Sequence, residues 1–470
     1  MVSEWEEFSL ADLYEVSSGL SKPAKDFGSG YPFLSFKDVF NNFFVPNELK
    51  QLVQSSKKEQ SKCSIKRGDV FLTRTSETMH ELGMSSVSLK DYEKATFNGF
   101  TKRLRPKTNK KIIPEFIGYY LRSPMFRQEM LAFSTMSTRA SLNNEMISRL
   151  KITLPPEKTQ SEIAHILKSL DDKIELNKKI NQTLEQMAQA MFKSWFVDFD
   201  PVFDNLLEKH DNNLEKSSAY LTNKGAEDLI PKLQQHHQIQ QTSDYKPLPD
   251  HIRKEFPNDF QRHDDMGWIP EGWPVSTTND EFDIYGGGTP STKNPAFWKG
   301  GAIHWTTPKD LSSSTTKVLL DTDRKITEEG LSKISSGLLP INTVLMSSRA
   351  PVGYLALAKV PIAINQGYIA LKCENHLSPF YTIQWLNSIL DEIKGVSGGT
   401  TFQEISKKTF RAIKLIVPNP DAISLFTNFV SGLYDSIETN LRNEKALTLI
   451  RDSLLPKLIS GEINLGDKGE

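Results

Sequence analysis

The segment Leu170-Asp-Asp-Lys-Ile-Glu-Leu-Asn177 returns in altered form 263 residues later, as Leu433-Tyr-Asp-Ser-Ile-Glu-Thr-Asn440. Each copy follows a short apolar run that ends in proline, residues 151–155 in one case and 414–418 in the other. The spacing is far longer than the roughly 20–50 residues of a solenoid repeat. The sequence therefore predicts a duplicated domain, each copy with its own following segment.

Weaker similarities between the two halves occur at slightly different spacings, as loop insertions would produce. They pair Trp5 with Trp273, Gly19 with Gly287, Ser35–Val39 with Thr307–Leu311, Gly68–Arg74 with Asn342–Ser348, and Asn98–Phe100 with Gln366–Tyr368. The similarity thus extends through the domains as well as the segments that follow them.

The segments after the domains have the pattern of long helices. Residues 159–196 contain neither Pro nor Gly, and their apolar residues recur at spacings of three and four, as in a heptad seam. The first seam consists of Ile163, Leu167, Leu170, Ile174, Leu184, Ala188, Met191 and Trp195; the second of Phe426, Val430, Leu433, Ile437, Leu447, Leu454 and Leu458. Pro456 predicts a kink or an end near the last turn of the second helix.

Each apolar seam needs a partner, and the simplest solution pairs the two helices with each other as an antiparallel coiled coil. Thirty-eight helical residues span about 57 Å. A polar Asn in such a seam costs stability but defines the register. We therefore expect Asn177 and Asn440, which are equivalent in the repeat, to meet or align across the pair. The alternative is that both face solvent at a frayed edge.

The fold class is α+β, with an internal pseudo-two-fold repeat. Residues 65–73 and 343–371 have the composition of short strands, and residues 114–133 and 378–394 are amphipathic at helical spacing. Residues 200–265 are polar and are expected to be extended or partly helical. The predicted order is a first domain at 1–155, a helix at 156–200, an acidic linker at 201–265, a second domain at 266–420 and a second helix at 421–465.

Composition excludes several classes of protein. Apolar residues make up 38% and charged residues 24% of the chain, which is typical of a globular protein. The two cysteines, Cys63 and Cys373, are far apart, so neither a disulfide framework nor a zinc cluster is predicted and a reducing cytoplasm is expected. No apolar run approaches the roughly 18 residues of a membrane span, and the N-terminus has no signal-peptide core.

Charge is uneven along the chain. Residues 1–155 hold 23 Lys and Arg against 17 Asp and Glu, and residues 266–420 hold 15 against 13. Residues 197–265 hold 8 against 14. Mildly basic domains beside an acidic connector are compatible with binding of a polyanion, although ordinary surface variation would explain the same numbers.

No motif predicts catalysis. Asn294-Pro-Ala-Phe297 partly resembles the Asn-Pro-Pro-Tyr/Phe motif of adenine methyltransferases, but its third residue is Ala and no glycine-rich cofactor loop precedes it. Tyr285–Thr289 lacks the spacing of a nucleotide-binding loop, so we expect a turn or a close backbone approach. The histidines at 210, 236, 237 and 251 lack metal-ligand spacing. No metal or catalytic residue is predicted.

Polar loops recur at matching places in the two copies, and their residue types suit nucleic acid. Arg can bridge guanine edges, Asn and Gln can bond adenine, and Lys, Ser and Thr can hold phosphates. The candidate DNA-binding residues are Lys37, Arg74, Thr75, Lys102, Arg103, Arg105, Thr138 and Arg139 in the first copy, and Lys309, Ser348, Arg349, Gln366, Tyr368, Thr400 and Thr401 in the second.

Three stretches resemble the specificity subunits of type I restriction–modification enzymes. Residues 170–202 resemble the central conserved region of that family, Gly267–Pro274 the opening of its second recognition domain, and Leu454–Ile463 its C-terminal ending. The resemblance implies two target-recognition domains separated by the paired helices. It also implies partners: double-stranded DNA, two methyltransferase subunits on the helical spacer and, in the restricting form, two translocase–endonuclease subunits. S-adenosylmethionine, ATP and Mg²⁺ would be held by those partners.

We therefore predict a non-catalytic subunit that binds a bipartite, asymmetric DNA site. One alternative is a free-standing methyltransferase–nuclease, which the absent cofactor motif disfavours. Another is a coiled-coil scaffold for proteins that lacks DNA sequence specificity.

Overall fold

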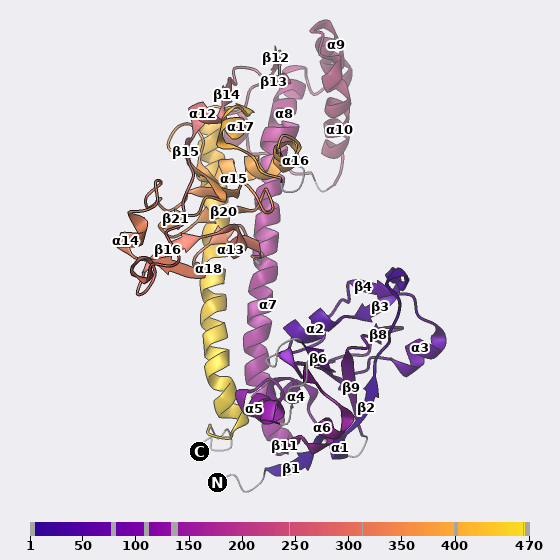
Figure 1. Cartoon of the computed structure of the whole chain (residues 1–470). Coiled ribbons are helices and arrows are strands. Elements are labelled where there is room, and N and C mark those ends of the chain that lie inside the picture. The colour runs from indigo at the N-terminus through magenta and orange to yellow at the C-terminus, as the bar shows by residue number, and fades with distance from the viewer. Residues whose placement is uncertain are drawn as a thin grey trace, which may run out of the picture. The chain divides into compact units, whose positions relative to one another are not determined.

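In a computed structural model, the chain forms two compact units, and each unit contains one of the repeated domains. The first unit comprises residues 1–175 and 443–470, and the second residues 176–442. Two long helices, α7 (Glu157–Lys193) and α18 (Pro420–Ile459), contribute to both units (Figure 1). The structure describes residues 5–76, 81–107, 112–132, 140–243, 245–312, 314–398, 403–463 and 465. No helix within these ranges is long and apolar enough to cross a membrane.

The first domain is built on a four-stranded antiparallel sheet in the order β2-β9-β5-β7. A second sheet has the order β4-β3-β8, with β8 parallel to β3, and the antiparallel pair β1-β11 brings the two ends of the domain together. The strands are β1 (Glu6–Ser9), β2 (Tyr14–Ser18), β3 (Phe27–Leu34), β4 (Gln51–Val53), β5 (Val70–Thr73), β6 (Thr75–Ser76), β7 (Ser85–Val87), β8 (Thr96–Phe97), β9 (Thr101–Pro106), β10 (Ala140–Ser141) and β11 (Lys151–Leu154). The helices are α1 (Leu10–Leu13), α2 (Phe36–Asn41), α3 (Lys57–Lys62), α4 (Pro114–Tyr120), α5 (Pro124–Ala132) and α6 (Asn144–Arg149).

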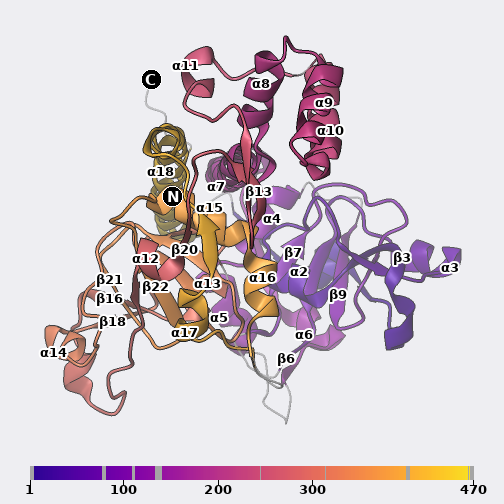
Figure 2. The same ribbon diagram turned by 90° about the horizontal axis from the view of Figure 1, so that it is seen from above.

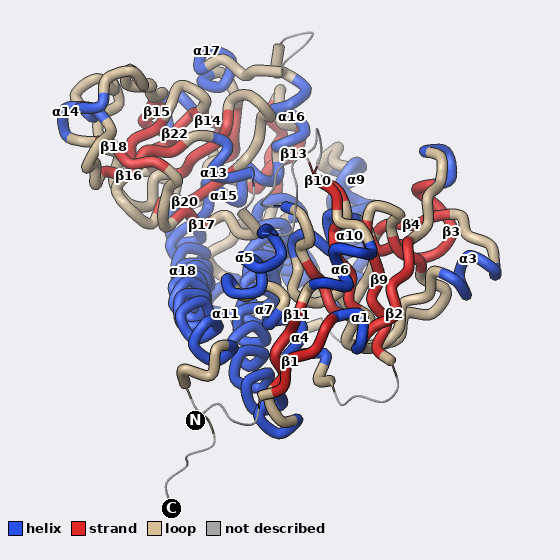
Figure 3. The backbone as a smooth tube through the Cα atoms, turned by 60° about the horizontal axis from the view of Figure 1, so that its bottom comes forward, coloured by secondary structure: helices blue, strands red, loops and turns tan. Residues whose placement is uncertain are grey.

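The second domain repeats this topology with one additional edge strand. Its sheets have the orders β15-β22-β19-β20-β17 and β18-β16-β21, and β14 pairs with β23 as β1 pairs with β11. Its strands are β14 (Val275–Thr277), β15 (Asp283–Tyr285), β16 (Ile303–Thr306), β17 (Val318–Leu319), β18 (Arg324–Ile326), β19 (Val344–Ser347), β20 (Leu355–Ala358), β21 (Ile362–Ile364), β22 (Tyr368–Lys372) and β23 (Lys414–Ile416). Its helices are α12 (Thr278–Glu281), α13 (Pro308–Ser312), α14 (Glu328–Leu331), α15 (Pro379–Ser388), α16 (Leu390–Gly395) and α17 (Lys407–Arg411). The strands of both domains are coloured red in Figure 3.

The first three residues of β5 and of β19 are all apolar because both faces of each strand are covered. In β5, Val70 and Leu72 belong to the core that α4, α5 and the long helices complete, whereas Phe71 belongs to the core beneath β3. In β19, Val344 and Met346 face one core and Leu345 the other. Side chains alternate across a strand, so a strand covered on both sides needs an unbroken apolar run.

The predicted strands and helices of the domains are confirmed, with one difference. Residues 114–133 and 378–394 each form two helices rather than one. In the first domain a turn at residues 121–123 separates α4 from α5, because Pro124 starts a new helix and cannot continue the preceding one. The helix α18 ends at Ile459, within one turn of Pro456, as the sequence predicts.

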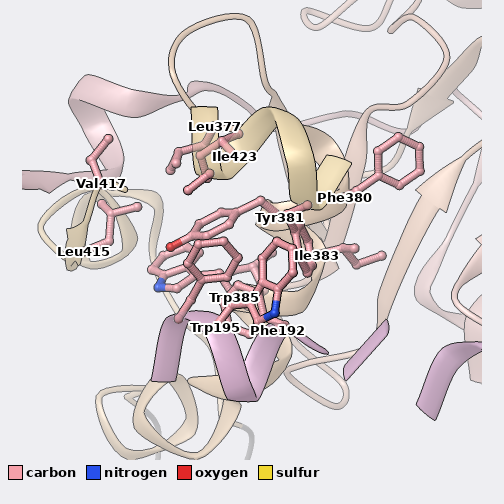
Figure 4. Close-up of a cluster of buried hydrophobic side chains, with 14 of the residues drawn as sticks. Phe192, Trp195, Leu377, Phe380, Tyr381, Ile383, Trp385, Leu415, Val417 and Ile423 are labelled. Atoms are coloured by element: carbon pink, nitrogen blue, oxygen red, sulfur yellow. The ribbon is translucent and has the colours of Figure 1, made fainter. Parts of the chain in front are cut away.

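The two long helices run antiparallel. In the second unit, the ring of Phe192 lies 5.9 Å from that of Phe426, and Asn181 bonds Asn440, so the residue numbers rise along one helix as they fall along the other. Aromatic residues near the end of α7 insert between α18 and α15: Figure 4 shows Phe192 and Trp195 beside Tyr381, and the rings of Phe192 and Tyr381 are 5.1 Å apart.

The predicted register of the asparagines is wrong by one helical turn. Asn440 donates from Nδ2 to Oδ1 of Asn181 at 2.8 Å, not to Asn177, although Asn177 is buried. In an antiparallel pair the residue numbers rise along one helix as they fall along the other, so equivalence in the repeat does not make two residues neighbours. Asn440 meets the residue one turn beyond Asn177 on α7.

Residues 200–265 are folded rather than extended, and their helical part is larger than expected. A π-helical turn (Ser194–Asp198) and Phe199, in the left-handed conformation, lead into this insert. It comprises α8 (Asp200–Lys209), α9 (Leu214–Asn223), α10 (Ile230–Gln240), α11 (Asp250–Arg253) and β12 (Phe260–His263). Directly after the insert, β13 (Gly267–Pro270) forms a hairpin with β12. Figure 2 shows α8, α9 and α10 grouped together. Apolar residues spaced among the charges, such as Phe203 and Leu221, are buried in a common core.

Candidate nucleic-acid interface

Four loops converge in each domain at the carboxyl ends of two parallel strands. In the first domain, β3 and β8 end side by side, and the amide of Asn98 donates to the carbonyl of Leu34 at 3.0 Å. In the second domain, the amide of Asn365 donates in the same way to Thr306 at 3.1 Å. The loops that follow these strands are therefore neighbours in both copies.

A glycine lets a further loop approach the same place. A Cβ on Gly19 would lie 2.2 Å from the carbonyl oxygen of Asn98, and a Cβ on Gly287 would lie 1.8 Å from that of Ile364. Real side chains never come so close, so only Gly fits at either position. The close backbone approach predicted for Tyr285–Thr289 is confirmed.

The loop after the central strand joins this group through two backbone hydrogen bonds. The amide of Arg74 donates to Phe100, and the carbonyl of Arg74 accepts from Leu142, both at 2.8 Å. In the second domain, Ser348 makes the same two bonds, to Gly367 at 2.8 Å and from Ile405 at 3.0 Å. The structure thus brings together equivalent polar loops that the sequence comparison had paired.

One of those sequence pairings is wrong by one residue. The side chain of Asn98 accepts from the amide of Phe100 at 2.6 Å, and that of Asn365 accepts from the amide of Gly367 at 2.9 Å. Asn98 therefore corresponds to Asn365 rather than to Gln366. The glycine lies at a different position in each loop, so aligning the two glycines shifted the sequence pairing by one residue.

Two predicted lysines occupy equivalent, exposed positions beside these loops. Lys37 and Lys309 are each the second residue of a helix that begins where β3 or β16 ends. Both helices start with a hydroxyl residue bonded to an Asp three residues later: the amide of Ser35 donates to Asp38 at 3.0 Å, and that of Thr307 to Asp310 at 2.7 Å. This capping defines the first turn that carries each lysine.

Arg74 and Lys102 place two positive charges together. Arg74 is exposed, while Lys102 is buried along most of its length and donates from Nζ to Ser18 Oγ at 3.0 Å. Burial lowers the pKa of Lys102, and the nearby charge of Arg74 lowers it further. A phosphate bound between the two cations would relieve this repulsion. Thr75, in β6, is partly exposed next to Arg74.

Arg103 and Arg105 are turned toward the protein, which corrects their assignment as DNA contacts. Arg103 is buried and donates to the carbonyl of Ser64 at 2.7 Å, and its pKa is lowered by burial and by Arg105. Arg105 holds the buried carboxylate of Asp69 with two bonds of 2.8 and 2.6 Å, and this pairing raises its pKa. Both side chains donate hydrogen bonds that hold the loop preceding β5.

Ser348 and Tyr368 are also removed from the set of surface candidates. Both are buried, and the hydroxyl of Tyr368 lies 3.1 Å from Thr306 Oγ1. Burial raises the pKa of Tyr368 well above its ordinary value. Ser348 contributes its backbone to the loop geometry, whereas the neighbouring Arg349 is partly exposed, 3.9 Å from Glu404.

Three residues that the sequence prediction left out lie in these loops or against them. Phe100 is 64% exposed at the tip of its loop, and Thr289 donates to the exposed Gln366 at 2.7 Å. Lys407 Nζ would lie 2.8 Å from a Cβ on Gly286, so it covers the glycine loop. Phe100 lies within a motif that the repeat pairs, and this pairing is the sequence signal that could have selected it. Lys407 is distant in sequence from the loop that it covers.

Several predictions are not placed by the structure or have other roles. Thr138, Arg139, Thr400 and Thr401 lie outside the described residues. Asn294, the first residue of the motif that partly resembles that of adenine methyltransferases, caps a short turn: its side chain accepts a hydrogen bond from the amide of Ala296 at 3.1 Å. His236 is a buried ion-pair partner of Asp204, with 2.6 Å between Nε2 and Oδ1.

Comparison with known proteins identifies the family. A family model described as type I restriction modification DNA specificity domain matches residues 2–186 and 270–445, one match in each half of the chain. The chain belongs to this family. It is thus a specificity subunit of the type I restriction–modification class, and the internal repeat is a repeat of the family's domain.

Individual relatives support the assignment along the whole chain. The HindI specificity subunit of Haemophilus influenzae is 30% identical over 480 aligned residues, which cover 98% of this chain and all of the relative. The MjaIX specificity subunit of Methanocaldococcus jannaschii is 34% identical over 188 residues, 40% of this chain and 43% of its own. The crystal structure of a type I S subunit from M. genitalium has a TM-score of 0.51 at 13% identity, covering 97% of this chain and 96% of that one, and shows the same fold.

Proposed function

We propose that each domain binds one half of a bipartite DNA site through its converging loops, and that the paired helices set the number of unread base pairs between the halves. The observation that carries this proposal is the equivalent set of loops, bonded alike through Arg74 and Ser348. Two similar binding surfaces in one chain, joined by a pair of long helices, suit two half-sites of one DNA.

The two halves of the site should differ in sequence, because the loops present different side chains. The first domain exposes Arg74 and Phe100, and the second exposes Arg349 and Gln366. Arg suits guanine, Gln suits adenine, and an aromatic ring packs against bases or sugars. The asymmetry of the chain therefore implies an asymmetric DNA site.

The reactions are assigned to partner subunits. Two methyltransferase subunits would dock on the long helices and hold S-adenosylmethionine, and two translocase–endonuclease subunits would hold ATP and Mg²⁺. In this division of labour the present chain contributes DNA specificity and the relative placement of its partners. We propose no cofactor of its own.

Methylome sequencing tests the proposal. The full chain is co-expressed with its methyltransferase partner in a host that lacks adenine methylation. We expect methylated adenines within a split, asymmetric motif whose gap has one length. A continuous motif, or methylation without any sequence preference in an active complex, would show that the proposal is wrong.

A further inference from the structure

Resting on the proposed function, we propose that Asp171 is a positioning residue. It holds the first recognition domain in one orientation on the two long helices, and it thereby determines how strictly the complex selects one gap length.

The carboxylate of Asp171 joins three separate elements of the first unit. It lies on α7, where its Oδ2 accepts from the hydroxyl of Tyr119, on the domain helix α4, at 2.6 Å. Its Oδ1 accepts from Nη1 of Arg451, on the opposite helix α18, at 2.7 Å. One side chain thus connects the domain to its own helix and to the partner helix.

The environment of these bonds makes them strong. The side chains of Asp171 and Arg451 are 19% and 16% exposed. Burial raises the pKa of Tyr119, and Asp171 raises it further, so the phenol remains a donor. The Arg451 guanidinium also lies 5.3 Å from the ring centre of Phe43, which belongs to the same domain as Tyr119. Charge-assisted bonds shielded from water are directional and cost free energy to break.

The second unit uses the corresponding helix position for the same purpose. Asp171 corresponds to Tyr434 at the 263-residue spacing of the repeat. The hydroxyl of Tyr434 accepts from Nε2 of Gln384, on the domain helix α15, at 2.9 Å, and both side chains are buried. The two copies conserve a helix-to-domain hydrogen bond at this position but differ in its chemistry. Because the bond recurs with different side chains, we infer that each domain needs a hydrogen bond to its long helix at this position, whether or not a charged group forms it.

The next residue provides a matched control. Asp172 is exposed and forms an ion pair with Lys168 one turn earlier on the same helix. Such a surface pair contributes little to stability. Replacing Asp172 removes a carboxylate from the same helical turn, while the three-element contact of Asp171 remains.

A positioning role and a purely stabilising role predict different results. If the contact only stabilises the fold, its loss lowers activity by one factor on every DNA. If the contact fixes the domain's orientation, its loss allows that domain to reach half-sites at neighbouring gap lengths. The informative quantity is therefore the ratio of rates between gaps, which does not depend on the amount of active complex.

The experiment uses the full chain in complex with its methyltransferase partner. Methylation rates are measured on duplexes that carry the half-sites at the native gap and at gaps one base pair shorter and longer. For D171N we expect the preference for the native gap to fall about tenfold, the contribution of one hydrogen bond to a charged group. For D172N we expect the wild-type ratio.

Y119F provides a second variant that removes only one hydroxyl and tests the same contact if D171N does not fold. Unchanged ratios in Y119F and in folded D171N, or equal losses at all three gaps, would overturn the proposal. If the wild-type complex itself shows no gap preference, the proposed bipartite function fails instead, so the two failures are distinguishable.

Discussion

Arginines of the same strand-and-loop region serve different purposes, and their surroundings decide which. Arg105 holds the buried Asp69 with two hydrogen bonds, whereas Arg74 is exposed and, among the described residues, forms its hydrogen bonds through its backbone. A guanidinium that already satisfies a buried carboxylate is not available to a base edge. Residue type alone therefore does not separate binding residues from structural ones.

This difference predicts opposite phenotypes for two alanine variants. R105A should destabilise the first domain by about 3 kcal/mol, because it leaves the carboxylate of Asp69 buried and unpaired. R74A should leave stability nearly unchanged but lower DNA affinity about tenfold, since one base or phosphate contact is lost. Urea unfolding and DNA titration at two salt concentrations measure the two effects. Equal stability losses in both variants would contradict the assignment.

The helical insert shows how an element of acidic composition acquires a fold. His236, on α10, lies between two carboxylates of α8, at 3.1 Å from Asp200 and 2.6 Å from Asp204. Burial by itself would lower the pKa of His236, but its hydrogen bonds with both carboxylates outweigh burial and raise the pKa to about 9. A protonated histidine therefore joins the two helices.

The stability of the insert should fall as the pH rises. Because the pKa of His236 is higher in the fold than its ordinary value of 6.5, its contribution is complete below pH 6.5 and is lost through about pH 9. The loss should amount to about 3 kcal/mol. Hydrogen exchange of residues 200–240, corrected for the intrinsic pH dependence, measures it.

Variants of two histidines provide the comparison. H236Q should lower protection and remove its dependence on pH, whereas replacement of His251, which is exposed on α11, should leave the wild-type curve. If wild-type protein and H236Q lose protection in parallel over this range, His236 does not control the effect.

The molecule as a whole is a duplicated module, and the boundaries of that module are structural. In the second domain, β14 and β23 pair and bring the domain's two ends together just before α18 begins. The stretch 275–418 is therefore the part that can be exchanged without changing the helices. The boundary at 266 would divide the hairpin formed by β12 and β13.

Exchange of residues 275–418 for the corresponding domain of another specificity subunit should change one half of the methylated motif. The other half and the gap should stay the same, since the first domain and both helices are retained. Methylome sequencing of the chimeric complex checks this expectation. A change in both halves at once would show that the domains do not bind DNA independently.

The sequence by itself determined the long helices, the repeat and the family. Their signals are local or periodic: the apolar seam of 159–196, the copy of Leu170–Asn177, and the absence of Pro and Gly within the first helix. Such patterns need no knowledge of distant contacts, because helical periodicity shows which residues share a face. The strands were equally predictable where two covered faces required a continuous apolar run.

Only the tertiary structure decided which side chains are available and which residues meet. The side chains of Arg103 and Tyr368 are buried in the fold. Packing of the long helices places Asn440 against Asn181, and the fold of the second domain brings Lys407 over Gly286. Asp171 gained its role in the same way, from partners 52 and 280 residues away. These outcomes depend on how separate elements pack, and such long-range packing leaves no periodic signal in the chain.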